Sequence, residues 1–166
     1  MPPDKAERPR DELGRPLPAG SPNRLAVDDL DGLSAAEANG IALAHFDAGR
    51  YFLAHEAWEA AWLESKGTAS EALFKGLAQL GAGYTHAARG NAHGMRVLLE
   101  RALDAIRAAP GPAWGIDLPA LGSLVERDLD RVRNLPEGAP LPPPEPWPLP
   151  PASLRPPGHC LLPVPV

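Results

Sequence analysis

The sequence predicts an all-α protein, a single helical bundle of four to five antiparallel helices with proline-rich N- and C-terminal extensions. The first observation is the placement of its 22 prolines, none of which lies between Asn23 and Ala109. Proline inside a helix removes a backbone donor and clashes with the preceding turn, so long helices are expected mainly within this window. The second observation is that apolar residues recur there at helical spacing, whereas no alternating run typical of a strand appears.

Capping residues and glycines indicate where the helices begin and end. A capping-box pattern starts at Ser34 and a second one at Thr68, while Gly49 suits the left-handed position that closes a helix. Asn91 can cap a fourth helix. The first helix is therefore expected between Ser34 and Gly49, and the later ones at residues 52–64, 69–89, 92–108 and 119–132.

Proline and composition divide the chain into three parts. Pro119 fits the first turn of the fifth helix, with Asp117 or Leu118 as its cap. The predicted divisions are a Pro/Gly-rich arm over residues 1–33, a helical bundle domain over 34–134 and a proline-rich tail over 135–166. The polar arm has too little apolar surface to offset its ordering entropy, so we expect it to be mostly irregular.

Charge and composition argue against several classes of protein. The net charge is −5 and the pI about 5.5, so no basic surface indicates nucleic-acid binding. No apolar run reaches the roughly 18–20 residues of a membrane span, and the first residues lack the apolar stretch of a secretory signal. The single cysteine, Cys160, excludes a disulfide within one chain. We therefore expect a cytoplasmic protein.

The densest polar cluster lies in the second expected helix. His55 and Glu59 are four residues apart and face one way, and Trp62 continues the same stripe. Glu56 is turned by about 100° onto an adjacent face. This combination of imidazole and carboxylate groups is the first candidate for a functional site.

A matching stripe of Gly76, Gln79, Gly83 and His86 follows in the third expected helix. Glycine costs about 1 kcal/mol of helix propensity relative to alanine, which favours a close approach of another backbone at these positions. We therefore expect the second and third helices to cross near Gly76 and Gly83, so that Gln79 and His86 face the polar stripe. The full candidate binding cluster is His55, Glu56, Glu59, Trp62, Gln79, His86 and Asn91.

Three interpretations of this cluster stay open, besides a site for some other ligand. It can be a buried hydrogen-bond network that fixes the register of two helices. It can be a divalent metal site in which His55, Glu59 and His86 are the ligands and Glu56 lies nearby. It can also be a metal-free acid–base pair of Glu59 and His55. The candidate catalytic residues are accordingly Glu56 and Glu59.

Two stretches resemble a known family. They are FDAGRYFLAHEAWEAAW over residues 46–62 and LFKGLAQLGAGYTHAARGNAHGM over residues 73–95, and together they resemble the domain of unknown function 309 family. The segment RDELGRPLP looks like the leader of some bacterial members. The resemblance implies a small all-helical bundle and no established activity. A tetratricopeptide-type hairpin is a poorer fit, because the two hairpins repeat after 41 residues rather than about 34.

Two functions remain in competition on the sequence alone. The first is a binding or interaction module with a structural His/Glu/Gln network between its second and third helices, whose partner is another protein or a second copy of the chain. The alternative is a metal-dependent hydrolase-like enzyme that uses His55, Glu59 and His86 as ligands.

Overall fold

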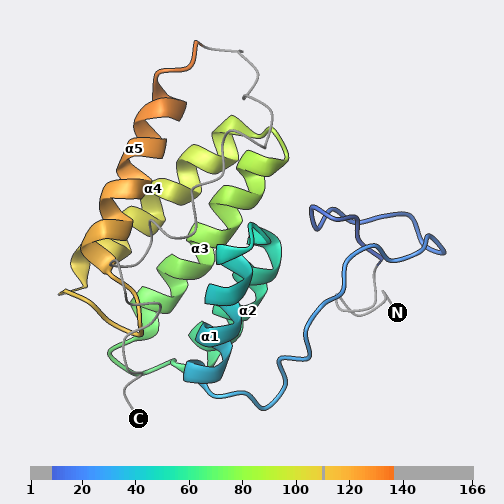
Figure 1. Ribbon diagram of the computed structural model, residues 1–166, viewed down its shortest axis with the longest axis horizontal. Coiled ribbons are helices and arrows are strands. Elements are labelled where there is room, and N and C mark those ends of the chain that lie inside the picture. The colour runs from blue at the N-terminus through green and yellow to red at the C-terminus, as the bar shows by residue number, and fades with distance from the viewer. Residues whose placement is uncertain (1–8, 110, 137–166) are drawn as a thin grey trace.

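The computed structural model describes residues 9–109 and 111–136, and these residues form five α-helices and no strand. Each helix packs against the next one along the chain, and successive helices reverse direction (Figure 1). The predicted all-α bundle is therefore confirmed. The helices are α1 (Ala35–Asp47), α2 (Tyr51–Glu64), α3 (Glu71–Ala88), α4 (Ala92–Ala108) and α5 (Leu118–Arg133).

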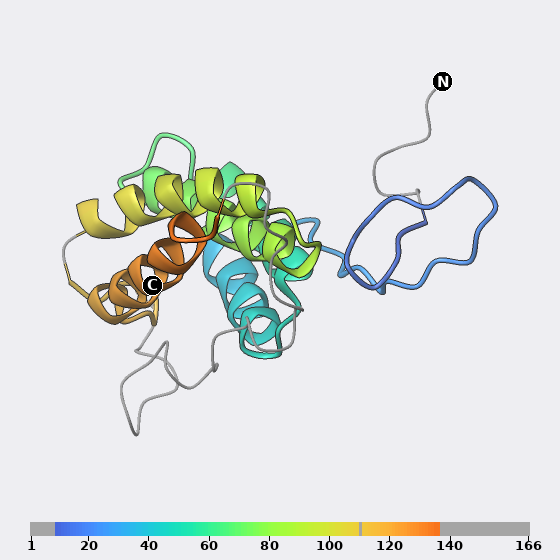
Figure 2. The same ribbon diagram turned by 90° about the horizontal axis from the view of Figure 1, so that it is seen from above.

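The helices form two layers. Seen from above, α3 and α4 lie side by side, and α1 and α5 lie on the same side of them (Figure 2). Residues 9–34, which precede α1, contain no helix. The proline-rich tail from residue 137 onward, Cys160 included, lies outside the described residues.

Three of the expected helix starts are capped by the residues that the sequence indicated. The Ser34 hydroxyl accepts a hydrogen bond from the backbone N–H of Glu37, and the Glu37 carboxylate completes the capping box. Asn91 accepts from the backbone of Gly94 at 3.0 Å, and Asp117 caps α5. Each cap satisfies a backbone donor that the first helical turn leaves without a partner.

The capping box expected at Thr68 is wrong. The Thr68 hydroxyl donates to the carbonyl of Ser65 at 2.6 Å and accepts from the backbone of Ser70 at 3.2 Å. The Glu71 carboxylate accepts from the backbone of Gly67 at 3.1 Å. These bonds close a turn behind α2, so α3 begins only at Glu71. Hydroxyl side chains suit turns as well as caps, and local sequence does not separate the two.

Aromatic side chains from three helices meet in the centre of the core. The ring of Phe46 lies 5.2 Å from Tyr51, 5.6 Å from Trp58 and 5.7 Å from Tyr84. All four side chains are buried, and such pairs stabilise beyond the area they bury. The Trp58 indole N–H donates to the side chain of Asn39 at 2.9 Å, which satisfies its polar atom. This cluster joins α1, α2 and α3 into one unit.

The same cluster reaches α5 through a buried hydrogen bond. The Tyr84 hydroxyl donates to Asp128 at 2.7 Å, and both residues are almost fully buried. Burial raises the pKa of Asp128, although the bond from Tyr84 and the charges of Arg127 and Arg131 lower it. The bond therefore holds a polar group in place where water does not compete for it.

Removing the Tyr84 hydroxyl is expected to destabilise the bundle. Tyr84→Phe leaves a buried carboxylate oxygen without its donor, which costs about 1–3 kcal/mol of the free energy of unfolding. The measurement is chemical unfolding of the wild type and the variant. The double variant Tyr84→Phe/Asp128→Leu serves as the control and should lose less, because it leaves no carboxylate behind. A single variant as stable as the wild type would contradict the role assigned to this bond.

Candidate functional site

The contact between α2 and α3 is made at Gly81. A Cβ there would lie 2.8 Å from the backbone nitrogen of His55 and 2.9 Å from its Cα, so only glycine lets the two backbones come this close. The expectation that these helices cross near Gly76 and Gly83 is wrong. A Cβ at those positions would meet side chains of α4 at 2.3 and 2.7 Å. The sequence shows small residues on α3 but not that α3 has a neighbour on two sides.

The imidazole of His55 bridges the two helices. Its Nδ1 lies 2.8 Å from the carbonyl oxygen of Ala78 on α3. A carbonyl only accepts hydrogen bonds, so Nδ1 carries the proton. The other ring nitrogen, Nε2, lies 3.2 Å from a carboxylate oxygen of Glu59 and 3.9 Å from one of Glu56. In the neutral ring this nitrogen bears the lone pair, and that lone pair faces two carboxylates.

The environment of His55 favours its charged form. Burial by itself lowers the pKa of His55, but the hydrogen bonds to Glu59 and Ala78 and the charges of Glu56 and Glu59 raise it above the usual 6.5. A positive charge between two carboxylates is therefore stabilised at this position. The three side chains stay open to solvent, with 23% of His55, 27% of Glu56 and 33% of Glu59 exposed.

His86 belongs to the connection between α3 and α4. The Asn91 carbonyl oxygen accepts from the backbone of Gly94, so the Asn91 amide donates to Nδ1 of His86, at 3.1 Å. That bond uses the lone pair of Nδ1 and leaves the proton of the neutral ring on Nε2. Burial lowers the pKa of His86, and the positive charges of Arg89 and His55 lower it further. His86 is therefore a neutral side chain that helps to hold the start of α4.

The structure brings together a different set of possible metal ligands from the expected His55, Glu59 and His86. His55, Glu56 and Glu59 each offer a ligand atom, and these atoms lie within 4.8 Å of one another. His86 is not in this group, and Glu56 completes it instead of serving as a neighbour. Gln79 follows Ala78 by one residue, so it is turned about 100° from the contact with α2 and is half-buried.

Trp62 extends the surface of the cluster by one helical turn beyond Glu59. Its ring lies 5.4 Å from the ammonium nitrogen of Lys66 and 5.6 Å from that of Lys75, which are distances suited to cation–π attraction. Its indole N–H is buried and has no hydrogen-bond partner among the described residues. Trp62 therefore forms an aromatic edge of the α2–α3 surface.

The N-terminal arm packs beside the cluster, which sequence reasoning missed. The guanidinium of Arg10 lies 4.9 Å from the ring of Phe52, and a Cβ on Gly14 would meet that ring at 2.4 Å. Arg89, the residue that caps the C-terminus of α3, donates to the carbonyl of Leu13 at 3.0 Å. The glycine in RDELGRPLP is the sequence signal of this close packing, but its partner lies far along the chain.

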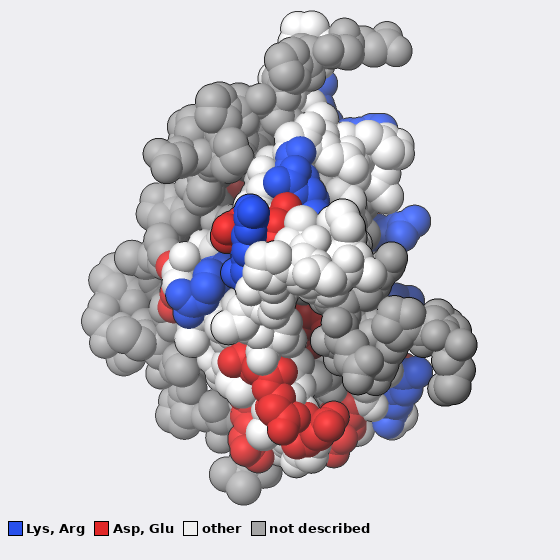
Figure 3. All heavy atoms as spheres, turned by 90° about the vertical axis from the view of Figure 1, so that its right-hand side faces the viewer, with Lys and Arg blue, Asp and Glu red and all other residues white. Residues whose placement is uncertain are grey.

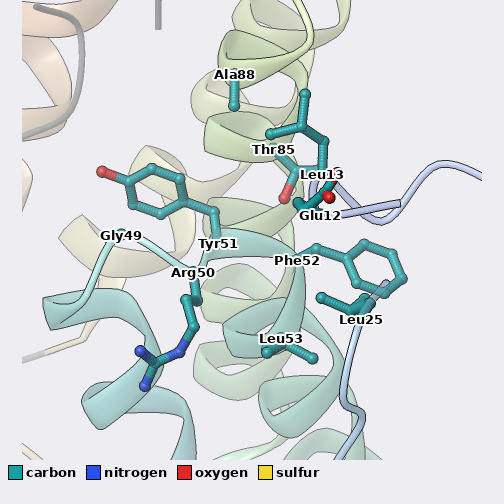
Figure 4. A pocket seen from close by; sticks show the side chains of 10 residues that line it. All are labelled: Glu12, Leu13, Leu25, Gly49, Arg50, Tyr51, Phe52, Leu53, Thr85 and Ala88. Carbon is teal, nitrogen blue, oxygen red and sulfur yellow. The ribbon is translucent and has the colours of Figure 1, made fainter. Parts of the chain in front are cut away.

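A small pocket lies where the arm meets the helices. Leu13 and Leu25 of the arm close over Phe52 of α2 and Thr85 of α3 (Figure 4). It encloses about 80 Å³, far below the roughly 300–1,000 Å³ of small-molecule sites. The pocket is therefore a gap in the packing of the arm, and none of the three clustered ligand residues lines it.

The surface charge is mixed. On the face drawn in Figure 3, acidic side chains gather in the lower part, and separate groups of Lys and Arg lie mostly above them, next to a second, smaller acidic group. Among the described residues, none of the helices is both long and apolar enough to cross a membrane.

Residues 41–98 match the sequence model of the family described as domain of unknown function (DUF309). The chain carries a DUF309 domain. The suspected family is therefore confirmed for the segment that begins in α1, contains α2 and α3, and ends in α4. All residues of the candidate cluster lie inside it. A search of curated proteins gave no match.

Gly81→Ala is expected to destabilise the DUF309 domain. The added Cβ would press on the backbone of His55, and overpacking of this kind costs about 1–3 kcal/mol. The control is Gly40→Ala in α1, where a Cβ meets nothing within 4 Å and the better helix propensity adds about 0.5–1 kcal/mol. Chemical unfolding measures both variants. Equal effects of the two substitutions would contradict the close contact.

The stability of the metal-free protein is expected to depend on the protonation of His55. Its pKa is higher in the folded chain than the unfolded value of about 6.5, so folding favours the protonated ring. The resulting stabilisation is full below about pH 6.5 and is lost as the pH rises through the folded-state pKa. Unfolding free energies measured over a pH series, with a chelator present, should show this decline for the wild type and a weaker one for Glu59→Gln. An imidazole that NMR finds titrating below 6.5 would contradict it.

Proposed function

We propose that this DUF309 protein is a binding module that takes a cationic group at the surface formed by His55, Glu56 and Glu59. The observation that carries the proposal is the partial exposure of these three side chains, between 23 and 33%. A network that only fixes helix register is expected to be sealed, because water otherwise competes for its hydrogen bonds. Here two carboxylates share one side of an imidazole and stay accessible from outside.

The cluster combines a structural part with an accessible part. The bond from His55 to Ala78 links α2 to α3, which is the role expected of a polar network between these helices. Glu56 and Glu59 project from α2, and their partly exposed carboxylates suit a positively charged group. The partners suggested by the sequence, another protein or a second copy of the chain, can supply such a group. A metal ion can supply the same charge.

Within residues 9–109 and 111–136, no contact favours the hydrolase-like alternative in the form that the sequence suggested. Its ligand set included His86, whose Nδ1 accepts a hydrogen bond from Asn91. The pocket of Figure 4 lies beside Phe52 rather than around the carboxylates. The binding function therefore has more support than the hydrolase-like one.

The binding and structural interpretations predict different stabilities. If Glu56 serves binding, Glu56→Gln should change the free energy of unfolding by less than about 0.5 kcal/mol, as for other exposed charge pairs. If it belongs to a structural network, the loss should reach about 1–3 kcal/mol. Chemical unfolding of metal-free protein decides between them. Tyr84→Phe is the positive control, because it leaves the fully buried carboxylate of Asp128 without its donor. A Glu56→Gln loss as large as that of the control would contradict the proposal.

A further inference from the structure

We infer that His55, Glu56 and Glu59 form a binding site for a divalent transition-metal ion, with the Nε2 atom of His55 as the nitrogen ligand. The inference rests on the proposed function, since it identifies the cationic group as a metal ion. Glu56 and Glu59 each contribute a carboxylate oxygen. All three ligands come from α2, and α3 contributes the carbonyl of Ala78, which orients His55.

The orientation of His55 is the first argument. A histidine that ligates a metal through one nitrogen almost always donates the other N–H to a carbonyl, a carboxylate or water. His55 does this from Nδ1 to the Ala78 carbonyl at 2.8 Å. Because that bond comes from a different helix, it fixes the ring independently of the carboxylates. Nε2 is thereby aimed at them, and a metal ion would bind this nitrogen in place of the proton that the two carboxylates favour.

The spacing of the ligand atoms is the second argument. Metal bonds to nitrogen and oxygen are about 2.0–2.2 Å long, so two ligand atoms on one tetrahedral ion lie about 3.4 Å apart. Nε2 lies 3.2 Å from Glu59 Oε2 and 3.9 Å from Glu56 Oε1. The first distance fits directly. The second requires a shift of about half an ångström, which a partly exposed glutamate makes by a small rotation.

The third argument is the chemistry of the donor set. Imidazole nitrogen suits zinc and neighbouring transition metals, whereas magnesium and calcium favour ligands that are all oxygen. One nitrogen and two carboxylate oxygens give a site with a net charge of about zero once a divalent ion is bound. Three partly exposed protein ligands leave at least one coordination position for water or for a group on a partner.

Gly81 explains how three ligands on one helix become a defined site. Its missing side chain allows the backbone of His55 to approach α3, and a Cβ there would meet His55 N at 2.8 Å. Only at that separation does the imidazole reach Ala78. A helix carrying the same three residues without this contact would leave the imidazole free to rotate away from the carboxylates.

The test is calorimetric titration of the metal-free, full-length protein with Zn²⁺, and separately with Mg²⁺. Every protein in the series carries Cys160→Ser, so that the thiol does not compete for zinc. The variants are Glu56→Gln and Glu59→Gln, which keep the shape of partly exposed side chains and are expected to fold. The controls are Glu64→Gln, an exposed carboxylate on the same helix, and His86→Gln.

The expected result is one Zn²⁺ per chain, no comparable binding of Mg²⁺, and at least a tenfold weaker affinity in each of the two glutamate variants. Both controls should bind like the parent protein. An NMR spectrum of the imidazole nitrogens should show zinc shifting Nε2 of His55 while Nδ1 keeps its proton. This second measurement reports on the ligand atom itself and not on stability.

Three outcomes would overturn the inference. They are no saturable zinc binding up to about 1 mM, unchanged affinity in Glu56→Gln and Glu59→Gln, or a loss in His86→Gln equal to theirs. After either of the first two outcomes, the proposed binding function still holds if Glu56→Gln is as stable as the wild type. The site then binds a cationic group other than zinc. If Glu56→Gln is strongly destabilised, the proposed function itself fails.

Discussion

The candidate site depends on the close approach of α2 and α3 at Gly81. The absence of a side chain there brings the backbone of His55 against α3, and the imidazole then reaches the carbonyl of Ala78. That bond decides which nitrogen carries the proton and where the other one points. Glu56 and Glu59 need only their positions on the same helix to meet it. One steric condition on α3 therefore sets both the geometry and the electrostatics of the cluster.

The helix that provides this contact is also the centre of the bundle. Gly76 and Gly83 hold α3 against α4, and Tyr84 joins the aromatic core and bonds to α5 through Asp128. A helix restrained on several sides moves little, so the carbonyl of Ala78 is a rigid acceptor for His55. The glutamates of the site are partly exposed, so its fixed geometry comes from the buried contacts of α3.

The second of the two stretches that resemble the family, residues 73–95, has a different role from the first, residues 46–62. His86, Asn91 and Gly94 pack together where α3 turns into α4, and a Cβ on Gly94 would lie 2.7 Å from the ring of His86. Their hydrogen bonds hold the start of α4. The polar residues of the second stretch therefore hold the connection between α3 and α4. Those of the first stretch form the accessible cluster. The arm adds a third element, since Arg10 covers Phe52 one turn before His55.

The amino-acid sequence by itself determined the all-α class, the caps at Ser34 and Asn91, and the shared face of His55 and Glu59, because these follow from local backbone chemistry and helical periodicity. Only the tertiary structure decided which glycine of α3 meets α2 and that Glu56 rather than His86 joins the cluster. Helical periodicity tells which residues share a face, but not which neighbour that face meets. Nor does a sequence tell that the Nδ1 lone pair of His86 already accepts a hydrogen bond from Asn91. Such bonds depend on which side chains the packing of the helices brings together.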